Sequence, residues 1–306
     1  MNADCRELLN RPLLESDLRE IVSNEWALRI RDLVLRYRQS HLPVMNGGFR
    51  YSNLLEGPSQ VLTCNPYRLW EYSSLFLALD ETSKRDLLLD LGGAGAPLAY
   101  VASEFGYRVL SVDLQPALVA IVQHVAAARS LSLEARVADV VTDLGELDGS
   151  VGTVAFVSVL EHIQPDARPQ VFEAIFRLLR RGGILYMTFD YGNYTERDSY
   201  VQKDRQRGLS RSIDSIGSLA AQLRQAGFRF RGNDPELLPA TMLQRKQSPG
   251  AKQVIRNLVM TTDPFDAETP WRAVLKYLVR RLFFRWRRYQ SRFESHNFFR
   301  MYLEKP

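Results

Sequence analysis

Residues 87–113 read LLLDLGGAGAPLAYVASEFGYRVLSVD, and this segment is the strongest indication of the fold. An apolar run carries Asp90 near its end, a glycine-rich turn follows, and a second apolar run ends at Asp113, 21 residues after Gly92. A strand, a glycine turn, a helix and a second strand in this order form half of a nucleotide-binding βαβ unit. Glycines let backbone N–H groups approach a ligand closely, and a carboxylate at the second strand end can accept both hydroxyls of a ribose.

Two classes of enzyme use such a unit: those that bind a dinucleotide and those that bind S-adenosylmethionine (SAM). The dinucleotide fingerprint is G-x-G-x-x-G, and counting from Gly93 its third small position falls on Leu98. A leucine there would obstruct the close packing of helix and strand that the third glycine allows. The turn therefore favours the SAM reading over the dinucleotide reading.

Four motifs in order resemble those of the class I SAM-dependent methyltransferases. Asp90-Leu-Gly-Gly resembles the first motif, and Asp139 in the segment ARVADV matches an acid that follows the third strand and hydrogen-bonds the adenine amino group in that family. TVAFVSVLEHI, residues 153–163, resembles the fourth-strand motif of the small-molecule branch, which includes the ubiquinone-biosynthesis type. VFEAIFRLLRRGGILYMTF, residues 171–189, is similar to the family's helix, Gly-Gly turn and fifth strand. Several motifs in the right order are far more specific than one glycine loop.

The alternation of strands and helices after residue 82 predicts an α/β fold with a doubly wound sheet. Its expected strands cover 86–91, 107–112, 134–138, 152–158, 184–190, 228–231 and 296–304, with helices over 96–105, 116–129, 166–180 and 213–226. The resemblance implies a Rossmann-like sheet of seven strands, the last of them antiparallel. The last two strands are separated by roughly sixty residues, at about 236–295, far more than the usual connection.

The first part of the chain, residues 1–82, reads as a helical extension in front of a methyltransferase domain over 83–306. Apolar residues at helical spacing predict one helix from Asp17 to Arg38. Asn65 and Pro66 then provide a cap and a first-turn proline for a second helix that reaches about Leu79. N-terminal helices in the resembled family often cover the bound donor.

The resemblance makes SAM the expected cofactor and assigns its binding residues. The donor site is expected at Asp90, Gly92, Gly93, Gly95, Asp113, Leu114, Asp139, Val140 and Ser158, and Arg68 or Tyr72 of the second helix is expected to reach the donor's carboxylate. The family's first motif usually has glycines where this chain has Ala94 and Ala96. That departure leaves a donor-binding module without catalysis as one alternative.

Methyl transfer from a sulfonium is an in-line displacement, so the protein must position the acceptor and, for a hydroxyl or amine, remove a proton. Candidate bases lie at the ends of the later strands: His162, whose imidazole titrates near neutral pH, and Asp190 and Tyr191. We find no metal-ligand pattern and expect no metal. The predicted function is methyl transfer to a small molecule, at a hydroxyl oxygen, in a biosynthetic or tailoring step.

The net charge of +5 arises from one segment, because residues 271–292 contain eight basic residues and no acid, which leaves −3 for the remainder. Apolar residues on one helical face alternate there with these bases, from Trp271 to Phe293. Such a basic amphipathic helix can pack on the protein, lie on an anionic membrane or meet an acidic partner. A lipid-linked or macromolecular acceptor is therefore a second alternative, whereas nucleic acid is not expected.

Two cysteines without metal-ligand spacing, Cys5 and Cys64, are typical of a reduced cytoplasmic setting, with peripheral membrane attachment as an alternative.

Overall fold

The computed structural model of the chain describes residues 9–13, 17, 20–39, 66–79, 85–93, 96–191, 216–238 and 297–306. One mixed sheet organises them, with its strands in the order β1-β8-β6-β5-β2-β3-β4 and with β7 also paired to β8. Strands β2 to β6 pair in parallel, and β8 runs antiparallel to β6. The strands are β1 (Arg11–Pro12), β2 (Leu87–Leu91), β3 (Arg108–Asp113), β4 (Leu133–Val137), β5 (Val151–Val157), β6 (Leu179–Tyr191), β7 (Arg229–Phe230) and β8 (Asn297–Glu304).

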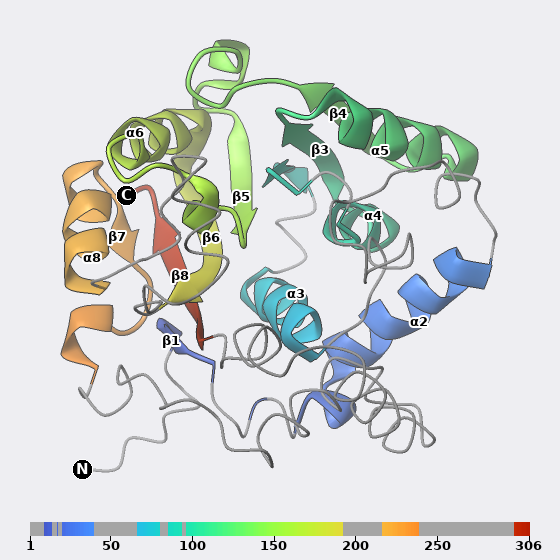
Figure 1. Ribbon diagram of the computed structural model, residues 1–306, viewed down its shortest axis with the longest axis horizontal. Helices are drawn as coiled ribbons and strands as arrows, with labels where there is room; N and C mark the ends of the chain where they lie inside the picture. The colour runs from blue at the N-terminus through green and yellow to red at the C-terminus, as the bar shows by residue number, and fades with distance from the viewer. Residues whose placement is uncertain are drawn as a thin grey trace, which may run out of the picture.

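All seven predicted strands are present, and the last is antiparallel as predicted. The helices are α2 (Glu25–Gln39), α3 (Pro66–Ala78), α4 (Leu98–Glu104), α5 (Pro116–Arg129), α6 (Arg168–Leu178) and α8 (Ile216–Gln225). Short 3₁₀ turns occur at η1 (Ile21–Ser23), η5 (Gly145–Leu147), η6 (Leu160–His162) and η7 (Pro235–Leu237). Figure 1 shows α6 and α8 on one side of the sheet and α3, α4 and α5 on the other.

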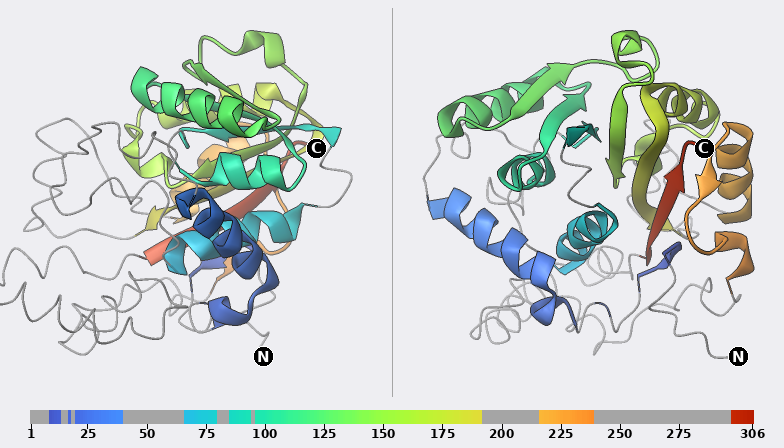
Figure 2. Two further views of the ribbon diagram at one scale, coloured as in Figure 1. Left: turned by 90° about the vertical axis from the view of Figure 1, so that its right-hand side faces the viewer. Right: turned by 180° about the vertical axis from the view of Figure 1, so that it is seen from behind.

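Two hydrophobic clusters cover the two faces of the sheet, because successive strand residues point to opposite sides. Leu88 of β2 packs with α2, α3, α4 and α5, whereas its neighbours Leu87 and Leu89 pack with α6 and α8. Figure 2, in its view from behind, shows α2 beside α3, and the two helices contact each other. The helical extension thus packs on the same face as α4 and α5. The division of the chain near residue 82 stays a prediction.

One helix prediction was wrong at the N-terminus. The helix expected from Asp17 to Arg38 is interrupted, since η1 ends at Ser23 and α2 begins at Glu25. Asn24 has extended backbone angles, and its side-chain oxygen accepts the N–H of Ala27 at 2.9 Å. Asn24 is therefore the N-cap of α2, a role that a periodicity argument overlooks.

A strand at Arg11–Pro12 was also not predicted, because two residues carry no alternation pattern. Asn10 holds this segment in place. Its side chain donates to the carbonyls of Arg231 and Asn233, and its Oδ1 accepts the N–H of Tyr302 at 2.7 Å. These bonds satisfy the polar groups of a side chain that has no exposed surface.

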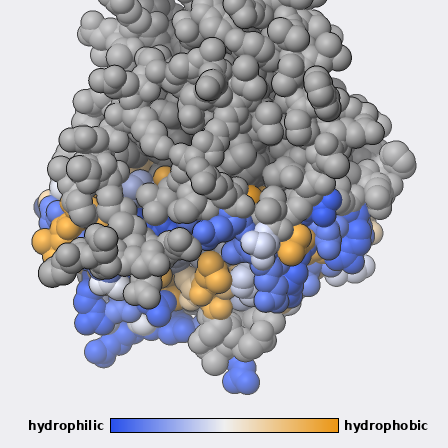
Figure 3. All heavy atoms as spheres, turned by 90° about the horizontal axis from the view of Figure 1, so that it is seen from below, coloured by the Kyte–Doolittle hydropathy of each residue, from blue (hydrophilic) through white to orange (hydrophobic). Residues whose placement is uncertain are grey.

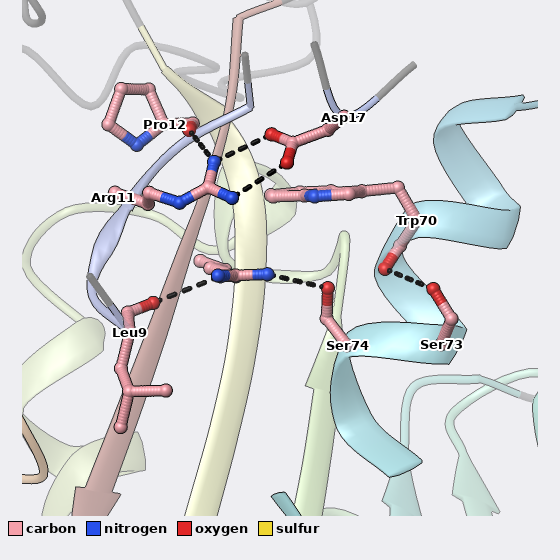
Figure 4. A network of polar contacts seen from close by, with 8 residues as sticks. Leu9, Arg11, Pro12, Asp17, Trp70, Ser73 and Ser74 are labelled. Atoms are coloured by element: carbon pink, nitrogen blue, oxygen red, sulfur yellow. Dashed lines mark hydrogen bonds and ion pairs between the residues drawn. The ribbon is translucent and has the colours of Figure 1, made fainter. Parts of the chain in front are cut away.

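A buried polar network then joins β1 and β8 to helix α3, as Figure 4 shows. Arg11 makes a bidentate ion pair with Asp17, at 2.6 and 2.7 Å. Arg300 of β8 donates to the carbonyl of Leu9 and to the hydroxyl of Ser74 on α3. Segments nearly three hundred residues apart in sequence are thereby fixed against the same helix.

The large hydrophobic side chains that are exposed among the described residues are Leu9, Leu77, Leu114, Val137 and Leu237. Figure 3 shows that hydrophilic residues prevail on the described part of the lower face, with hydrophobic ones in small groups. No helix among the described residues is long and apolar enough to cross a membrane. The basic segment from Trp271 to Phe293, and most of the predicted insertion at about 236–295, lie outside the described residues.

Candidate active site

Acidic residues meet at the carboxyl edge of three neighbouring strands. Asp90 lies in β2 one residue before its end, Asp113 ends β3, and Asp139 follows β4 by two residues. The register pairs Leu91 with Val112 and Asp113 with Val137, so these strand ends lie side by side. The carboxyl edge of an open α/β sheet is where such folds bind their ligands.

The glycine turn after β2 leaves no room for side chains. Gly92 has a left-handed φ of +72°, and a Cβ on Gly93 would lie 2.2 Å from Oδ1 of Asp90. The N–H of Gly92 donates to the carbonyl of Val112 at 2.7 Å, which fixes the turn to β3. Glycine at these two positions is therefore required by conformation and by close approach. Gly95 lies outside the described residues.

Asp90 is a buried acid, with 1% of its surface exposed. Ser111 on β3 donates to its Oδ2 at 3.2 Å. Burial raises the pKa of Asp90 to about 7, and the charge of Asp113 adds to this rise, whereas the bond from Ser111 opposes it. The carboxyl group faces Gly93 and so lies against the loop itself.

Asp113 and Asp139 are half-buried and each shape a turn. Oδ1 of Asp113 accepts the N–H of Gln115 at 2.9 Å, and Oδ1 of Asp139 accepts the N–H of Val141 at 2.8 Å. A carboxylate has about four lone-pair positions, so one such bond does not exhaust its capacity to accept. Leu114 next to Asp113 is 67% exposed.

Val137, at the end of β4, is 51% exposed and pairs in register with Asp113. Sequence reasoning did not select it. An exposed valine beside an exposed Leu114, between two acids, forms a small apolar surface that suits the face of a purine ring. Val140, which sequence reasoning did select, is instead buried in the hydrophobic cluster under α6 and α8.

Helix α3 brings a second group of polar side chains to the ends of β5 and β6. Glu71 has no exposed surface, and its Oε1 accepts the hydroxyls of Ser158 at 2.7 Å and Thr188 at 2.6 Å. Its Oε2 accepts Nη1 of Arg68 at 2.8 Å. The structure thus joins two predicted site residues, Arg68 and Ser158, through a carboxylate that was not predicted. Its signal in the sequence is weak: Glu71 is the one acid in PYRLWEYSSLFLA, the sequence of α3.

Ser158 follows the last residue of β5 and has a left-handed φ of 54°, which is uncommon for a residue other than glycine. Its N–H donates to the carbonyl of Thr188 at 2.9 Å. The residue after it, Val159, is the one that a Cβ on Gly92 would meet, at 2.9 Å. The end of β5 therefore lies directly against the glycine turn, and strain of this kind clusters at functional sites.

Arg68 lies among acids and keeps 37% of its side chain exposed. Burial alone would lower its pKa, but the charges of Glu71, Tyr72 and Glu161 raise it above its ordinary value. The guanidinium is therefore a permanent cation at this edge. Tyr72, in contrast, is 2% exposed and packs in the hydrophobic cluster of α2 to α5.

Of the three residues predicted as candidate bases, the structure describes the side chain of one and only the backbone of the other two. His162 is exposed in η6 after the end of β5, next to the buried Glu161. Asp190 and Tyr191 end β6, where they pair in register with Phe298 and Asn297 of β8, but their side chains lie outside the described part of the chain. No group of metal-binding side chains occurs among the described residues.

This edge can hold an adenosyl group with a charged amino-acid tail. Carboxylates at Asp113 and Asp139 suit a ribose and a purine, Leu114 and Val137 offer apolar contact, and Gly93 allows close approach to backbone. The cation of Arg68 suits a carboxylate. The residues present therefore fit such a donor in their charge and hydrogen-bonding chemistry.

Comparison with known proteins shows the family to which the chain is similar. A family model described as "Methyltransferase domain" matches residues 88–183. The chain is 30% identical over 184 residues to a ubiquinone biosynthesis O-methyltransferase of Xanthomonas euvesicatoria pv. vesicatoria (strain 85-10), covering 57% of this chain and 74% of that protein. It is 33% identical over 134 residues to the enzyme of the same name from Xanthomonas oryzae pv. oryzae (strain PXO99A), covering 44% of this chain and 53% of that one.

Among solved structures, the chain is similar to phosphoethanolamine N-methyltransferase 2 of Haemonchus contortus in complex with S-adenosyl-L-methionine. The sequence identity is 18% and the TM-score is 0.47, with 72% of this chain and 49% of that chain covered.

Proposed function

Because the chain belongs to the class I SAM-dependent methyltransferases of small-molecule type, we propose that it transfers a methyl group to a hydroxyl oxygen of a small-molecule acceptor. The observation that carries the donor part is that Asp90, Asp113 and Asp139 lie at the carboxyl ends of three neighbouring strands, the first of which ends in a turn where Gly93 has no room for a side chain. The choice of oxygen is supported by the relatives, which are named ubiquinone biosynthesis O-methyltransferases. We therefore infer a hydroxylated ring compound, of the kind that precedes ubiquinone, as the acceptor class.

In this proposal the strand ends bind the adenosine part of the donor. Asp113 accepts the ribose hydroxyls, and Asp139 accepts the adenine amino group. Leu114 and Val137 contact the purine ring, since both expose apolar surface beside these acids. The turn at Gly92, Gly93 and Gly95 lets the backbone approach the donor closely, while Val140 supports this edge from the core.

Helix α3 and the end of β5 bind the methionine part. Arg68 pairs with the donor's carboxylate, because its guanidinium is cationic and partly exposed at this edge. Ser158 lines the same end of the site, and the buried Tyr72 lies close enough to Arg68 to influence its pKa. When bound, the donor supplies an electrophilic methyl group on a sulfonium.

The protein's contribution is to fix the acceptor oxygen in line with that methyl group and to take its proton. His162 is the first candidate for the base, as it is exposed where β5 ends. Asp190 and Tyr191 are the others, at the end of the adjacent strand β6. A pH profile of kcat for His162→Ala and for Asp190→Asn assigns the role, since loss of the base removes its ionisation from the profile.

The function is tested by incubating the purified chain with deuteromethyl-labelled SAM and a set of acceptors. The set contains hydroxylated ring compounds and matched compounds in which an amine replaces the hydroxyl. We expect mass spectrometry to show the labelled methyl on a hydroxyl compound and not on its amine counterpart. Labelled amines alone would contradict the choice of oxygen. Gly93→Ala serves as the control, because its added Cβ would clash with Asp90.

A further inference from the structure

Glu71 is a fully buried carboxylate in the middle of α3, and the cofactor chemistry does not require it to touch a ligand. Burying an ion is costly unless the group is paired and hydrogen-bonded. Glu71 meets that condition through three donors from three elements: Arg68 on its own helix, Ser158 after β5 and Thr188 on β6. The carboxylate therefore couples a helix to two strand ends that are 87 and 117 residues away in sequence.

Two of these three partners lie at the open edge of the site. Arg68 keeps more than a third of its side chain exposed, and Ser158 is partly exposed with a left-handed backbone. A guanidinium on a long stem has many rotamers, and a charge-assisted bond to a fixed carboxylate selects among them. The bond between Ser158 and Glu71 likewise fixes a serine rotamer at the end of β5. Glu71 thus sets the direction of both groups without reaching the site itself.

The docking of α3 on the sheet has separate supports. The hydroxyl of Tyr186 donates to the backbone carbonyl of Glu71 at 2.6 Å, and that of Tyr302 donates to the carbonyl of Ser74 at 2.6 Å. Arg300 donates to the Ser74 hydroxyl at 2.9 Å. These bonds hold α3 on the sheet independently of the Glu71 carboxylate, so the two roles can be separated by mutation.

We propose that Glu71 is a positioning residue, which holds Arg68 and Ser158 in the geometry that recognises the amino-acid end of the donor. This inference rests on the proposed function, because it assumes that Arg68 pairs with the donor's carboxylate. It assigns to α3 a specific task in donor recognition.

Glu71→Gln is the direct test, since glutamine keeps the size of the side chain. Its amide oxygen can still accept from Ser158 or Thr188, but its NH₂ group cannot accept from Arg68. Calorimetry then compares two ligands, S-adenosylhomocysteine and 5′-methylthioadenosine, of which the second lacks the amino-acid part. We expect Glu71→Gln to lower the affinity for S-adenosylhomocysteine about 10-fold or more, while the affinity for 5′-methylthioadenosine changes by less than about twofold.

Tyr186→Phe is the matched control, because it removes a bond from α3 to the sheet and leaves the carboxylate of Glu71 in place. We expect it to lower the melting temperature and to preserve the ratio of the two affinities. If Glu71→Gln fails to fold, Thr188→Val is measured in its place, since it removes one of the bonds to Oε1. We expect Thr188→Val to lower the affinity for S-adenosylhomocysteine by about threefold and to leave the affinity for 5′-methylthioadenosine unchanged.

A folded Glu71→Gln variant with the wild-type ratio of the two affinities would overturn the inference. A Tyr186→Phe variant whose ratio falls as much as that of Glu71→Gln would also overturn it. If Thr188→Val is measured in place of Glu71→Gln, an unchanged ratio of the two affinities would likewise overturn the inference. These results leave the proposed function intact, because the wild-type chain still prefers S-adenosylhomocysteine. A wild-type chain that binds neither ligand overturns the proposed function and the inference with it.

Discussion

Replacing Asp90 by Asn should flatten the dependence of the protein's stability on pH. In the unfolded chain the carboxyl group has its ordinary pKa of 3.8, and in the folded chain burial raises the pKa to about 7. Between these two values the folded state keeps a proton that the unfolded state releases. The free energy of unfolding therefore falls as the pH rises through this window, and the contribution is lost above pH 7.

The size of the effect follows from the shift. Each pKa unit corresponds to about 1.4 kcal/mol, so Asp90 alone lowers the free energy of unfolding by up to about 4 kcal/mol between pH 4 and pH 8. Asparagine does not titrate, so Asp90→Asn should remove this part of the pH dependence. The difference between the two chains is the quantity to measure, because it cancels the contributions of other groups.

Urea unfolding of both chains at several pH values, followed by tryptophan fluorescence, measures this difference. Ser111→Ala adds a test of sign: the bond from Ser111 lowers the pKa of Asp90, so its loss should make the fall in stability larger. An Asp90→Asn variant that keeps the wild-type pH dependence would contradict the raised pKa of Asp90, and so would a Ser111→Ala variant with a smaller fall in stability.

Three other predictions concern binding and packing. Gly93→Ala should abolish the binding of S-adenosylhomocysteine in calorimetry, because its Cβ would lie 2.2 Å from an oxygen of Asp90; wild-type affinity would show that the loop adapts. Arg11→Met should lower the free energy of unfolding, measured in urea, by about 3 kcal/mol or more, since it leaves Asp17, which is 12% exposed, without its bidentate partner. A decrease below about 1 kcal/mol would contradict this. Tyr302→Phe should cost about 1 kcal/mol, through the lost bond to α3, and an unchanged unfolding midpoint would argue against that contact.

Sequence reasoning found the sheet because strand patterns are local. The run from Leu87 to Asp113 contains its own strand, turn, helix and strand, and Asp113 and Asp139 follow apolar strands at the expected places. Val137 was not predicted as a site residue, because its exposure next to Asp113 depends on the pairing of β4 with β3, which is not a local property of the sequence. The break at Asn24 was missed because a cap competes with periodicity over only a few residues.

The polar groups of α3 show what sequence alone does not reveal. Arg68 was selected through a family resemblance, but its partner Glu71 was not, since the bonds of Glu71 reach Ser158 and Thr188 across the fold. An acid inside an apolar helix is equally compatible with an exposed helix face. Only the packing of α3 against the sheet, with no exposed surface left on Glu71, separates the two cases.

A crystal structure of the chain with S-adenosylhomocysteine tests the donor site most directly. We expect the ribose on Asp113, the adenine against Leu114 and Val137 beside Asp139, and the carboxylate on Arg68. Density for the ligand at another edge of the sheet, or none at saturating concentration, would contradict it.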